Sequence, residues 1–299
     1  MEDEKIVKEG KKDDLLLRIE QKYYKLSKGQ KQLADYVCEN YDKAVFLTAA
    51  KMGECVGVSE STVVRFAMQL GYDGYPKFQK ALEELVKNKL NSIQRMELTY
   101  GRVGQSEVLS KVLMSDIQNI KITMEQIDQN VFETAVETIL KAKKIYVIGI
   151  RSCAPLAAFL VFYLNLVCDN VVAINTNNSG EIFEQMIRID ENDVIIGISF
   201  PRYSMRTLKA LEFASNRKAK VITLTDSVRS PINLYSSCNL ITRSNMASIV
   251  DSLVAPLSVV NALVTALCMK RQKEVVSTLE TLEKIWDEYQ VYSRDELEK

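Results

Sequence analysis

Five short runs rich in β-branched residues, spaced along the second half of the chain, place the strongest limit on what it can fold into. The runs are residues 143–149, 170–175, 193–199, 219–225 and 238–242. Amphipathic helices are predicted after the first three, at 155–167, 181–187 and 205–215, with a smaller turn after the fourth. Strands that alternate with helices form a parallel sheet covered on both faces. We therefore predict a three-layer α/β domain.

The loops after the predicted strands carry hydroxyl and guanidinium groups. In a parallel sheet these loops meet at the carboxyl ends of the strands, where ligands bind. Serine hydroxyls, helix N-termini and arginine charges suit an anionic small molecule, most simply a phosphate ester. Each serine could be an ordinary cap or turn residue, but their coincidence at three strand ends favours a binding site. The predicted ligand-binding residues are Ser152, Arg151, Ser199, Arg202, Ser204 and Ser227.

An all-α domain is predicted before this sheet, because residues 48–78 indicate two short helices joined by a tight turn. Gly57 supplies a turn position that tolerates positive φ, and Ser59 stands where an N-cap would begin the second helix. Inward-facing residues are expected at helical spacing: Val63, Val64, Phe66, Ala67 and Leu70. This is a helix-turn-helix pattern, although a helical hairpin without DNA-binding function would need the same turn and cap.

Polar groups on the outer side of the second helix are those that reach base edges and phosphates in a major groove. Four lysines without an intervening acid, Lys22, Lys25, Lys28 and Lys31, precede a helix expected to begin near Gln30. They suit either phosphate contact or a solvated helix start. The predicted DNA-binding residues are Thr48, Ser59, Ser61, Thr62, Arg65, Gln69 and Lys28.

Histidine is absent from all 299 residues, which removes the usual general base and the commonest metal ligand. Lysine, glutamate, aspartate and tyrosine could still transfer protons, so this argues against catalysis without excluding it. Six cysteines lack CxxC spacing and are expected to be buried, reduced thiols rather than a zinc site: Cys38, Cys55, Cys153, Cys168, Cys238 and Cys268. We expect no catalytic residue, metal or cofactor.

Composition leaves room for two domains, since 47% of the residues are hydrophobic. The formal net charge is zero, with 39 basic and 39 acidic residues, so any preference for nucleic acid must come from local patches. No apolar run is long enough to span a bilayer, and the first residues are charged rather than signal-like. We expect a cytoplasmic protein without membrane contact.

Residues 26–82, which begin LSKGQKQLADYV and contain VSESTVVRF, resemble the N-terminal domain of the RpiR family of bacterial transcriptional regulators. The later half resembles the sugar isomerase (SIS) domain with which that family senses phosphosugars. The resemblance implies a regulator of carbohydrate metabolism genes. It also implies a double-stranded DNA operator, most simply an inverted repeat, a phosphosugar effector and a homodimer or homotetramer.

In SIS domains the loop after the third strand usually reads S-x-S-G-x-T. Ser199 matches the first serine and Ser204 stands at the threonine, but Pro201 and Arg202 replace the second serine and the glycine. Arg202 could replace both with a bidentate contact, so the ligand could also be a sugar acid or a diphosphate. In the first loop either Ser152 or the residue after it could face the phosphate, and the hydroxyl is the better donor.

We predict four segments: an N-terminal extension at 1–22, a DNA-binding domain with a linker helix at 23–100, a SIS domain at 106–272, and a helical tail at 273–299. Helical stretches at 81–98 and 107–128 are expected to transmit ligand binding to the DNA-binding helices. Two alternatives stay open. One is an isomerase-like SIS enzyme, and the other is a regulator whose SIS domain serves only oligomerisation.

Overall fold

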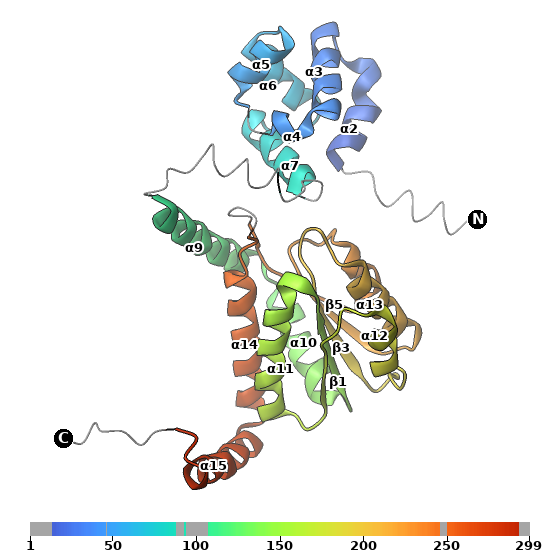
Figure 1. Ribbon diagram of the computed structural model, residues 1–299. Helices are drawn as coiled ribbons and strands as arrows, with labels where there is room; N and C mark the ends of the chain where they lie inside the picture. Colours follow the sequence, from blue (N-terminus) through green and yellow to red (C-terminus); the bar gives the residue numbers. More distant parts are fainter. Residues whose placement is uncertain (1–13, 46, 88–92, 94–106, 246–249, 293–299) are drawn as a thin grey trace, which may run out of the picture. The chain divides into compact units, whose positions relative to one another are not determined.

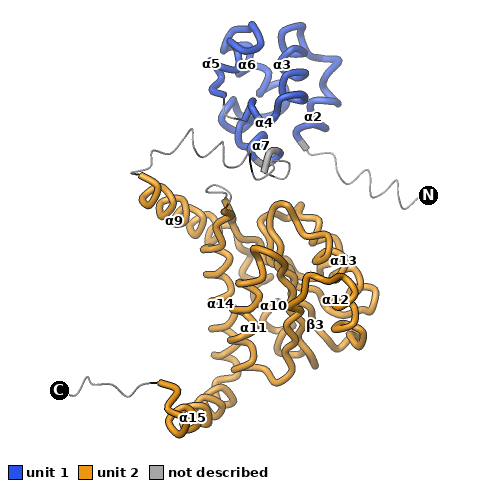
Figure 2. Tube along the Cα trace, in the orientation of Figure 1, with its two compact units in different colours: residues 1–98 blue, residues 99–299 orange. Residues whose placement is uncertain are grey.

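The computed structural model describes residues 14–45, 47–87, 93, 107–245 and 250–292. The chain forms two compact units, residues 1–98 and residues 99–299 (Figure 2). The first is helical and the second contains a parallel sheet (Figure 1). Both predicted fold classes are therefore confirmed.

Unit 1 is built from short helices around one apolar core. Its helices are α2 (Asp14–Lys22), α3 (Lys28–Glu39), α4 (Tyr41–Ala44), α5 (Ala49–Val56), α6 (Glu60–Gln69) and α7 (Tyr75–Lys87), with a 3-10 turn, η1 (Tyr23–Lys25). Leu33, Met52, Phe66 and Phe78 are fully buried. The rings of Phe66 and Phe78 meet edge to face with centroids 5.6 Å apart, a geometry that aromatic pairs prefer.

Two boundaries of unit 1 differ from the prediction. Residues 14–22, assigned to an N-terminal extension, form α2 instead, because Leu15 and Ile19, four positions apart, bury their side chains in the core. Helix α3 begins at Lys28 rather than near Gln30. Ser27 is its N-cap, and the Ser27 backbone N–H donates to the Gln30 side chain at 3.0 Å in a capping box.

Unit 2 contains a five-stranded sheet in the order β2-β1-β3-β4-β5, and every neighbouring pair is parallel. The strands are β1 (Ile145–Gly149), β2 (Val171–Ile174), β3 (Val194–Ile198), β4 (Lys220–Thr225) and β5 (Cys238–Ile241). Each lies within one of the five predicted runs. Strands β1 and β3 are buried along their whole length, as expected for central parallel strands.

Helices cover both faces of the sheet. The helices of unit 2 are α9 (Val108–Gln126), α10 (Gln129–Lys141), α11 (Ala154–Val167), α12 (Ser179–Gln185), α13 (Met205–Asn216), α14 (Val254–Lys270) and α15 (Gln272–Glu288). Val147 and Ile196 pack with α10, α11 and α14 on one face. Tyr146 and Ile195 pack with α12 and α13 on the other, so alternate strand residues serve opposite layers.

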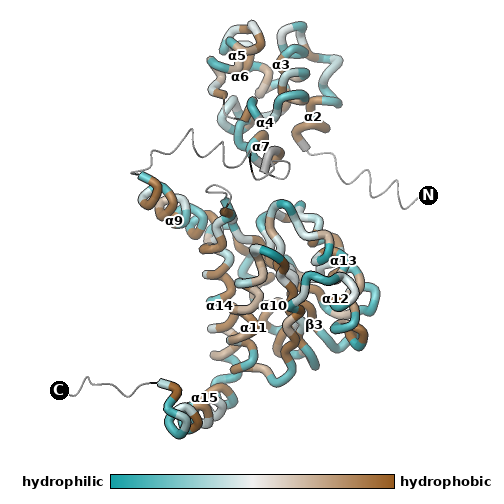
Figure 3. The backbone as a smooth tube through the Cα atoms, viewed as in Figure 1, coloured by the Kyte–Doolittle hydropathy of each residue, from teal (hydrophilic) through white to brown (hydrophobic). Residues whose placement is uncertain are grey.

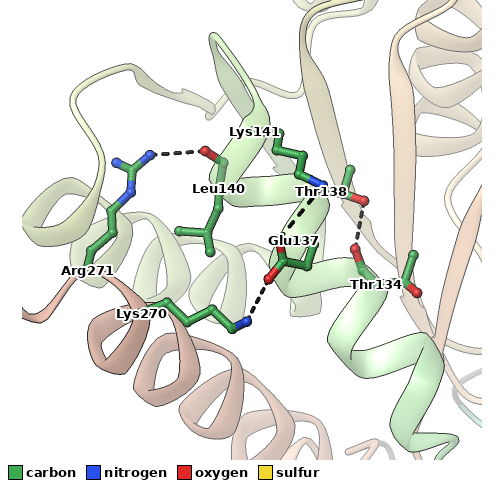
Figure 4. A network of polar contacts seen from close by, with 7 residues as sticks. All are labelled: Thr134, Glu137, Thr138, Leu140, Lys141, Lys270 and Arg271. Carbon is green, nitrogen blue, oxygen red and sulfur yellow. Dashed lines mark hydrogen bonds and ion pairs between the residues drawn. The ribbon is translucent and has the colours of Figure 1, made fainter.

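One arginine joins several helix ends in unit 2 (Figure 4). Arg271 lies between α14 and α15, and its guanidinium donates to the carbonyl of Val167 at 3.2 Å and to that of Leu140 at 3.0 Å. These carbonyls belong to the last turns of α11 and α10, where a cation also complements the helix dipoles. Beside it, Lys270 pairs with Glu137 at 2.6 Å and lowers the pKa of that carboxyl.

Parts of the predicted linker lie outside the described residues. Of the helical stretch predicted at 81–98, the structure describes only residues 81–87, which belong to α7, and Ile93, which is exposed. The predicted tail forms α15, in which Val275 is buried while Leu279 and Ile285 stay exposed. No single helix in the described part of the chain is long and apolar enough to cross a membrane; α14 and α15 pass only as a pair bent by 99°.

The cysteine prediction was partly wrong. Cys153, Cys168 and Cys238 are buried free thiols as expected, but Cys38 and Cys55 are exposed. Both exposed cysteines lie on the outer sides of unit 1 helices, where the apolar neighbours in sequence belong to the opposite face. Within the described ranges, no group of three or more histidine, cysteine or acidic residues could hold a metal ion.

Candidate functional site

Helices α5 and α6 form the predicted helix-turn-helix, and both are capped by the residues at their starts. Thr48 Oγ1 accepts from the Lys51 backbone N–H at 3.2 Å, and Ser59 Oγ accepts from the Thr62 N–H at 3.3 Å. Between the helices Gly57 adopts φ 75°, the left-handed conformation that glycine takes without a steric penalty. Thr48 and Ser59 therefore have a structural role, and their contact with DNA stays a prediction.

A close approach that the sequence analysis missed fixes the angle between these helices. Gly53 in α5 is buried, and a Cβ on it would lie 2.6 Å from the Val58 carbonyl oxygen and 3.3 Å from the Glu60 nitrogen. The Gly53 carbonyl accepts a hydrogen bond from the Val58 N–H at 2.9 Å. Only glycine permits this contact, because the opposing atoms are backbone atoms that cannot turn aside.

The outer face of α6 is polar, as predicted. Ser61, Arg65 and Gln69 are exposed and Thr62 is half-buried, while Val63, Phe66 and Ala67 lie in the core. The Arg65 Nε donates to the Ser61 carbonyl at 3.2 Å, which holds the start of that side chain along the helix. The structure thus brings the hydroxyl, guanidinium and amide groups onto one accessible helix face.

The predicted lysines divide into two groups. Lys22 Nζ donates to the Gln69 carbonyl at 2.8 Å, so it caps the C-terminal end of α6, and Lys31 Nζ lies 5.5 Å from the centre of the Tyr23 ring. Lys28 is exposed at the first turn of α3. The next residue, Gly29, faces Val58 and Thr62, which places Lys28 near the start of α6.

The second candidate site lies at the carboxyl ends of β1 and β3. Strands β1 and β3 are neighbours in the sheet. After β1 the chain continues to β2 at one edge, and after β3 it continues to β4 in the opposite direction, so the order of strands reverses between β1 and β3. Ligands of open parallel sheets bind at such a switch point. Arg151 and Ser152 follow β1, and Ser199, Arg202 and Ser204 follow β3, so five of the predicted residues share this edge.

The loop after β1 exposes Arg151 and Ser152 and buries Cys153. Arg151 adopts φ 59°, a left-handed conformation that is uncommon outside glycine. Burial raises the pKa of the Cys153 thiol to about 11, although hydrogen bonds from the Phe200 backbone and the Ser152 side chain lower it. Cys153 is thus a neutral thiol that ties the loop after β1 to the loop after β3, and Ser152 is the accessible hydroxyl.

The loop after β3 is held by its own serines. Ser199 is buried, and its Oγ accepts from the Ser204 backbone N–H at 3.1 Å. Ser204 is the N-cap of α13, and its Oγ accepts from the Thr207 N–H at 3.3 Å. Arg202 is exposed at φ 66°, so it adopts the glycine-like backbone at the position where the SIS pattern has glycine. The loop therefore keeps a left-handed turn although the glycine is absent.

Two residues in this region were not predicted. The Tyr203 hydroxyl donates to Asp226 Oδ1 at 2.7 Å and so joins the loop after β3 to the loop after β4. Asp226 places a carboxylate directly before Ser227, whose Oγ accepts from the Arg229 N–H at 3.2 Å within its own turn. Ser227 is the weakest of the predicted ligand-binding residues, because an anion there would meet a negative charge.

A pocket of about 440 Å³ lies elsewhere, beside β5 and the start of α10. Its lining includes Asp128, Val131, Val228 and Cys238. Asp128 Oδ1 accepts from the Asn130 N–H at 2.8 Å as the N-cap of α10, so the carboxylate already uses the positive end of that helix. This pocket does not suit an anion.

Sequence comparison identifies both units. The rpiR-family helix-turn-helix domain matches residues 13–89, and the SIS domain matches residues 138–266. The chain belongs to the RpiR family. The family match begins at residue 13, which agrees with the inclusion of α2 in the helical unit.

Similar proteins extend over most of the chain. An uncharacterised HTH-type transcriptional regulator of Clostridium perfringens is 25% identical over 226 residues, which are 76% of this chain and 80% of the relative. The sugar isomerase domain of an RpiR transcription factor from Sphaerobacter thermophilus matches with 26% identity and a TM-score of 0.57, covering 60% of this chain and 99% of that one. The Vibrio vulnificus NanR protein complexed with ManNAc-6P shares the fold with a TM-score of 0.55, at 22% identity over 91% of this chain and 97% of its own.

Proposed function

We propose that this RpiR-family protein is a sequence-specific transcriptional regulator of carbohydrate metabolism genes whose DNA binding responds to a phosphosugar or related sugar anion. The observation that carries the proposal is the family match over both units, joined to an α6 whose outer face is polar and exposed. The protein is proposed to act in the cytoplasm, where its operator is.

On DNA, α6 is the proposed recognition helix. Arg65 and Gln69 would contact base edges in the major groove, while Ser61, Thr62 and Lys28 would contact phosphates. The hydroxyl groups of Thr48 and Ser59, at the starts of α5 and α6, would donate to phosphates of the DNA backbone. A dimer related by a two-fold axis would present two such helices to an inverted repeat.

The proposed effector site comprises the loops after β1 and β3. Ser152, Ser199 and Ser204 would donate to a phosphate group near the N-terminus of α13, with Arg151 and Arg202 supplying positive charge. Ser227 stays a secondary candidate because of Asp226. We propose no catalytic role, since a chain without histidine lacks the usual proton-transfer group.

Regulation requires only that the effector prefers one arrangement of the dimer over another. A tenfold difference in affinity between the two arrangements shifts their equilibrium by about 1.4 kcal/mol, which is within the usual range of allosteric coupling. The effector then changes operator affinity by changing the separation of the two α6 helices.

Affinity selection of genomic fragments on the full-length protein at near-physiological salt tests DNA recognition. One enriched inverted repeat is expected, and its neighbouring genes would nominate the sugar. Arg65→Ala should abolish that enrichment, whereas Lys80→Ala, which removes one exposed positive charge from α7, should preserve it. Equal operator affinity of Arg65→Ala and the wild type would refute the proposed recognition helix.

Thermal stabilisation by a panel of phosphosugars and sugar acids tests the effector site. An active ligand should raise the melting temperature of the wild type, and Ser199→Ala or Arg202→Ala should reduce the shift without altering operator affinity in the absence of ligand. If no member of the panel shifts the melting temperature, a SIS domain used only for assembly becomes the better explanation. Turnover of a panel member would favour the enzyme.

A further inference from the structure

Two cysteines lie at the same end of two helices that pack against each other. Helices α11 and α14 are neighbours on one face of the sheet (Figure 1), and Figure 3 shows hydrophobic residues along both. Cys168 is the residue at which α11 ends, and Cys268 lies in the last turn of α14. The two helix ends are joined by Arg271, which directly follows α14 and donates to the Val167 carbonyl of α11 at 3.2 Å.

The neighbouring contacts show which side of α14 carries Cys268. Lys270 pairs with Glu137 of α10 at 2.6 Å, so its side of α14 faces α10 (Figure 4). Successive residues of an α-helix are rotated by about 100°, so Cys268 and Lys270 point about 160° apart. Leu267, which is fully buried, lies between these two directions. Cys268 therefore stands on the side of α14 that is opposite α10, where α11 packs.

Both cysteines belong to one apolar environment. The Cys168 side chain is buried in the core layer of α10, α11 and α14, and the half-buried Cys268 packs against the same layer. Burial raises the pKa of the Cys168 thiol, while the Arg271 guanidinium lowers it. The negative charge of a Cys268 thiolate also raises the pKa of Cys168. Charges act on each other strongly only at short range, so this effect agrees with two neighbouring thiols.

A small cavity gives access to Cys168. Its volume is about 80 Å³, and its lining includes Cys168, Asp169, Asn170 and Arg271. A cavity of this size holds a few water molecules. It therefore admits hydrogen peroxide, which is little larger than water, but excludes bulky thiol reagents. Arg271 also supplies the positive charge that stabilises a reactive thiolate.

The other two buried thiols of the described residues lack this setting. Burial raises the pKa of both Cys153 and Cys238 to about 11, and neither has a cation or a second cysteine among the groups that shift its pKa. The Cys238 Sγ donates to the Val131 carbonyl at 3.2 Å, which occupies its proton. Burial alone therefore does not distinguish Cys168, but its neighbours do.

We propose that Cys168 and Cys268 are an oxidation site at which hydrogen peroxide forms a disulfide within the SIS domain. The Cys168 thiolate attacks one peroxide oxygen, so that an S–O bond forms, the O–O bond breaks and hydroxide leaves. The Cys268 sulfur then attacks the resulting sulfenic acid, and the second oxygen leaves as water. In total, two thiols and one peroxide give one disulfide and two water molecules. The inference does not depend on the proposed function.

The disulfide would have a measurable effect on stability. It joins residues 168 and 268, which are 100 positions apart in the sequence. The closed loop would contain β2, β3, β4 and β5, so the bond would strongly restrict the unfolded chain. The oxidised protein is therefore expected to melt at a higher temperature than the reduced protein, and a reductant should reverse the difference.

Peptide mass spectrometry of the full-length protein tests the proposal. The reduced protein is treated with hydrogen peroxide, unfolded and alkylated. A linked peptide pair that contains Cys168 and Cys268 is expected, and its yield should exceed the oxidation of Cys153 and Cys238 at least tenfold. The exposed Cys38 and Cys55 are the internal control for the oxidant, because they react without any change in structure.

Two variants separate the steps. Cys268→Ser should abolish the linked pair and leave a sulfenic acid on Cys168, which dimedone would trap. Cys238→Ala is the matched control, because it removes another buried thiol and should keep the linked pair. Circular dichroism of the reduced proteins checks that both variants fold. If peroxide oxidises Cys38 and Cys55 but leaves Cys168 and Cys268 open to alkylation after unfolding, or links either one to a different cysteine, the proposal is overturned.

Discussion

Replacement of Gly53 by alanine is expected to destabilise unit 1 and weaken operator binding together. The added Cβ would lie 2.6 Å from the Val58 carbonyl oxygen, so α5 and the turn after it must separate. Overpacking of this kind costs about 1–3 kcal/mol, and the opposing backbone places this case at the upper end. Alanine recovers about 1 kcal/mol of helix propensity. The net loss in the free energy of unfolding is therefore about 2 kcal/mol.

Urea unfolding followed by circular dichroism measures this loss, and a shift of about 10 °C in the melting of a unit of this size is its thermal equivalent. Gly57→Ala is the control. A Cβ at Gly57 meets no atom within 4 Å, so its cost of about 1 kcal/mol comes only from the left-handed backbone at φ 75°.

DNA binding separates the two variants. Gly53→Ala should lower operator affinity beyond its effect on the folded fraction, because it changes the angle between α5 and α6. Gly57→Ala should alter operator affinity less than Gly53→Ala does. A Gly53→Ala protein with wild-type stability and wild-type operator affinity would refute the role assigned to this contact.

Three further predictions concern the accessibility of the thiols, the titration of Cys153 and the charge of two lysines. Iodoacetamide at pH 8 should label Cys38 and Cys55 in the native protein but not Cys153, as read by mass spectrometry; native labelling of Cys153 would contradict its burial. The raised pKa of the Cys153 thiol means that its proton stabilises the fold below pH 9 and that this contribution is lost as the pH rises toward about 11. Between pH 9 and about 11 the free energy of unfolding of the wild type should therefore fall by about 2–3 kcal/mol more than that of Cys153→Ala. Equal losses in the two proteins would argue against a raised pKa of Cys153. Lys28→Ala should reduce the slope of log affinity against log salt by about 1, whereas Lys22→Met should lower stability and leave the slope unchanged; a changed slope for Lys22→Met would assign that lysine to DNA.

The sequence predicted elements whose signal is local. The β-branched runs gave all five strands, because a buried parallel strand is apolar along its length. The turn at Gly57 and the caps at Thr48 and Ser59 depend only on neighbouring residues, so the sequence predicted them as well. Helix α2 was missed because its apolar residues form one short run within a charged segment, and the spacing of four between Leu15 and Ile19 is a weak signal over so short a segment.

The rest of the candidate site depends on contacts between distant residues. Gly53 looks like an unfavourable helix residue until Val58 is placed opposite it. Tyr203 and Asp226 belong to different loops, and only the pairing of β3 with β4 brings them together. The burial pattern of α9 could not be inferred either: Asn119 and Thr123 are buried while Leu113 and Ile117 stay exposed, and the periodicity of a helix does not say which side its domain will cover.

Arg271 has a consequence for how the protein is degraded. Trypsin cleaves after arginine, yet this arginine holds the ends of α10 and α11 and lies between α14 and α15. A protease must pull its target segment out as an extended strand, which would break these contacts at once. Cleavage after Arg271 should therefore require the opening of the whole SIS domain. The rate of this cleavage would then measure how often that domain unfolds within the intact chain.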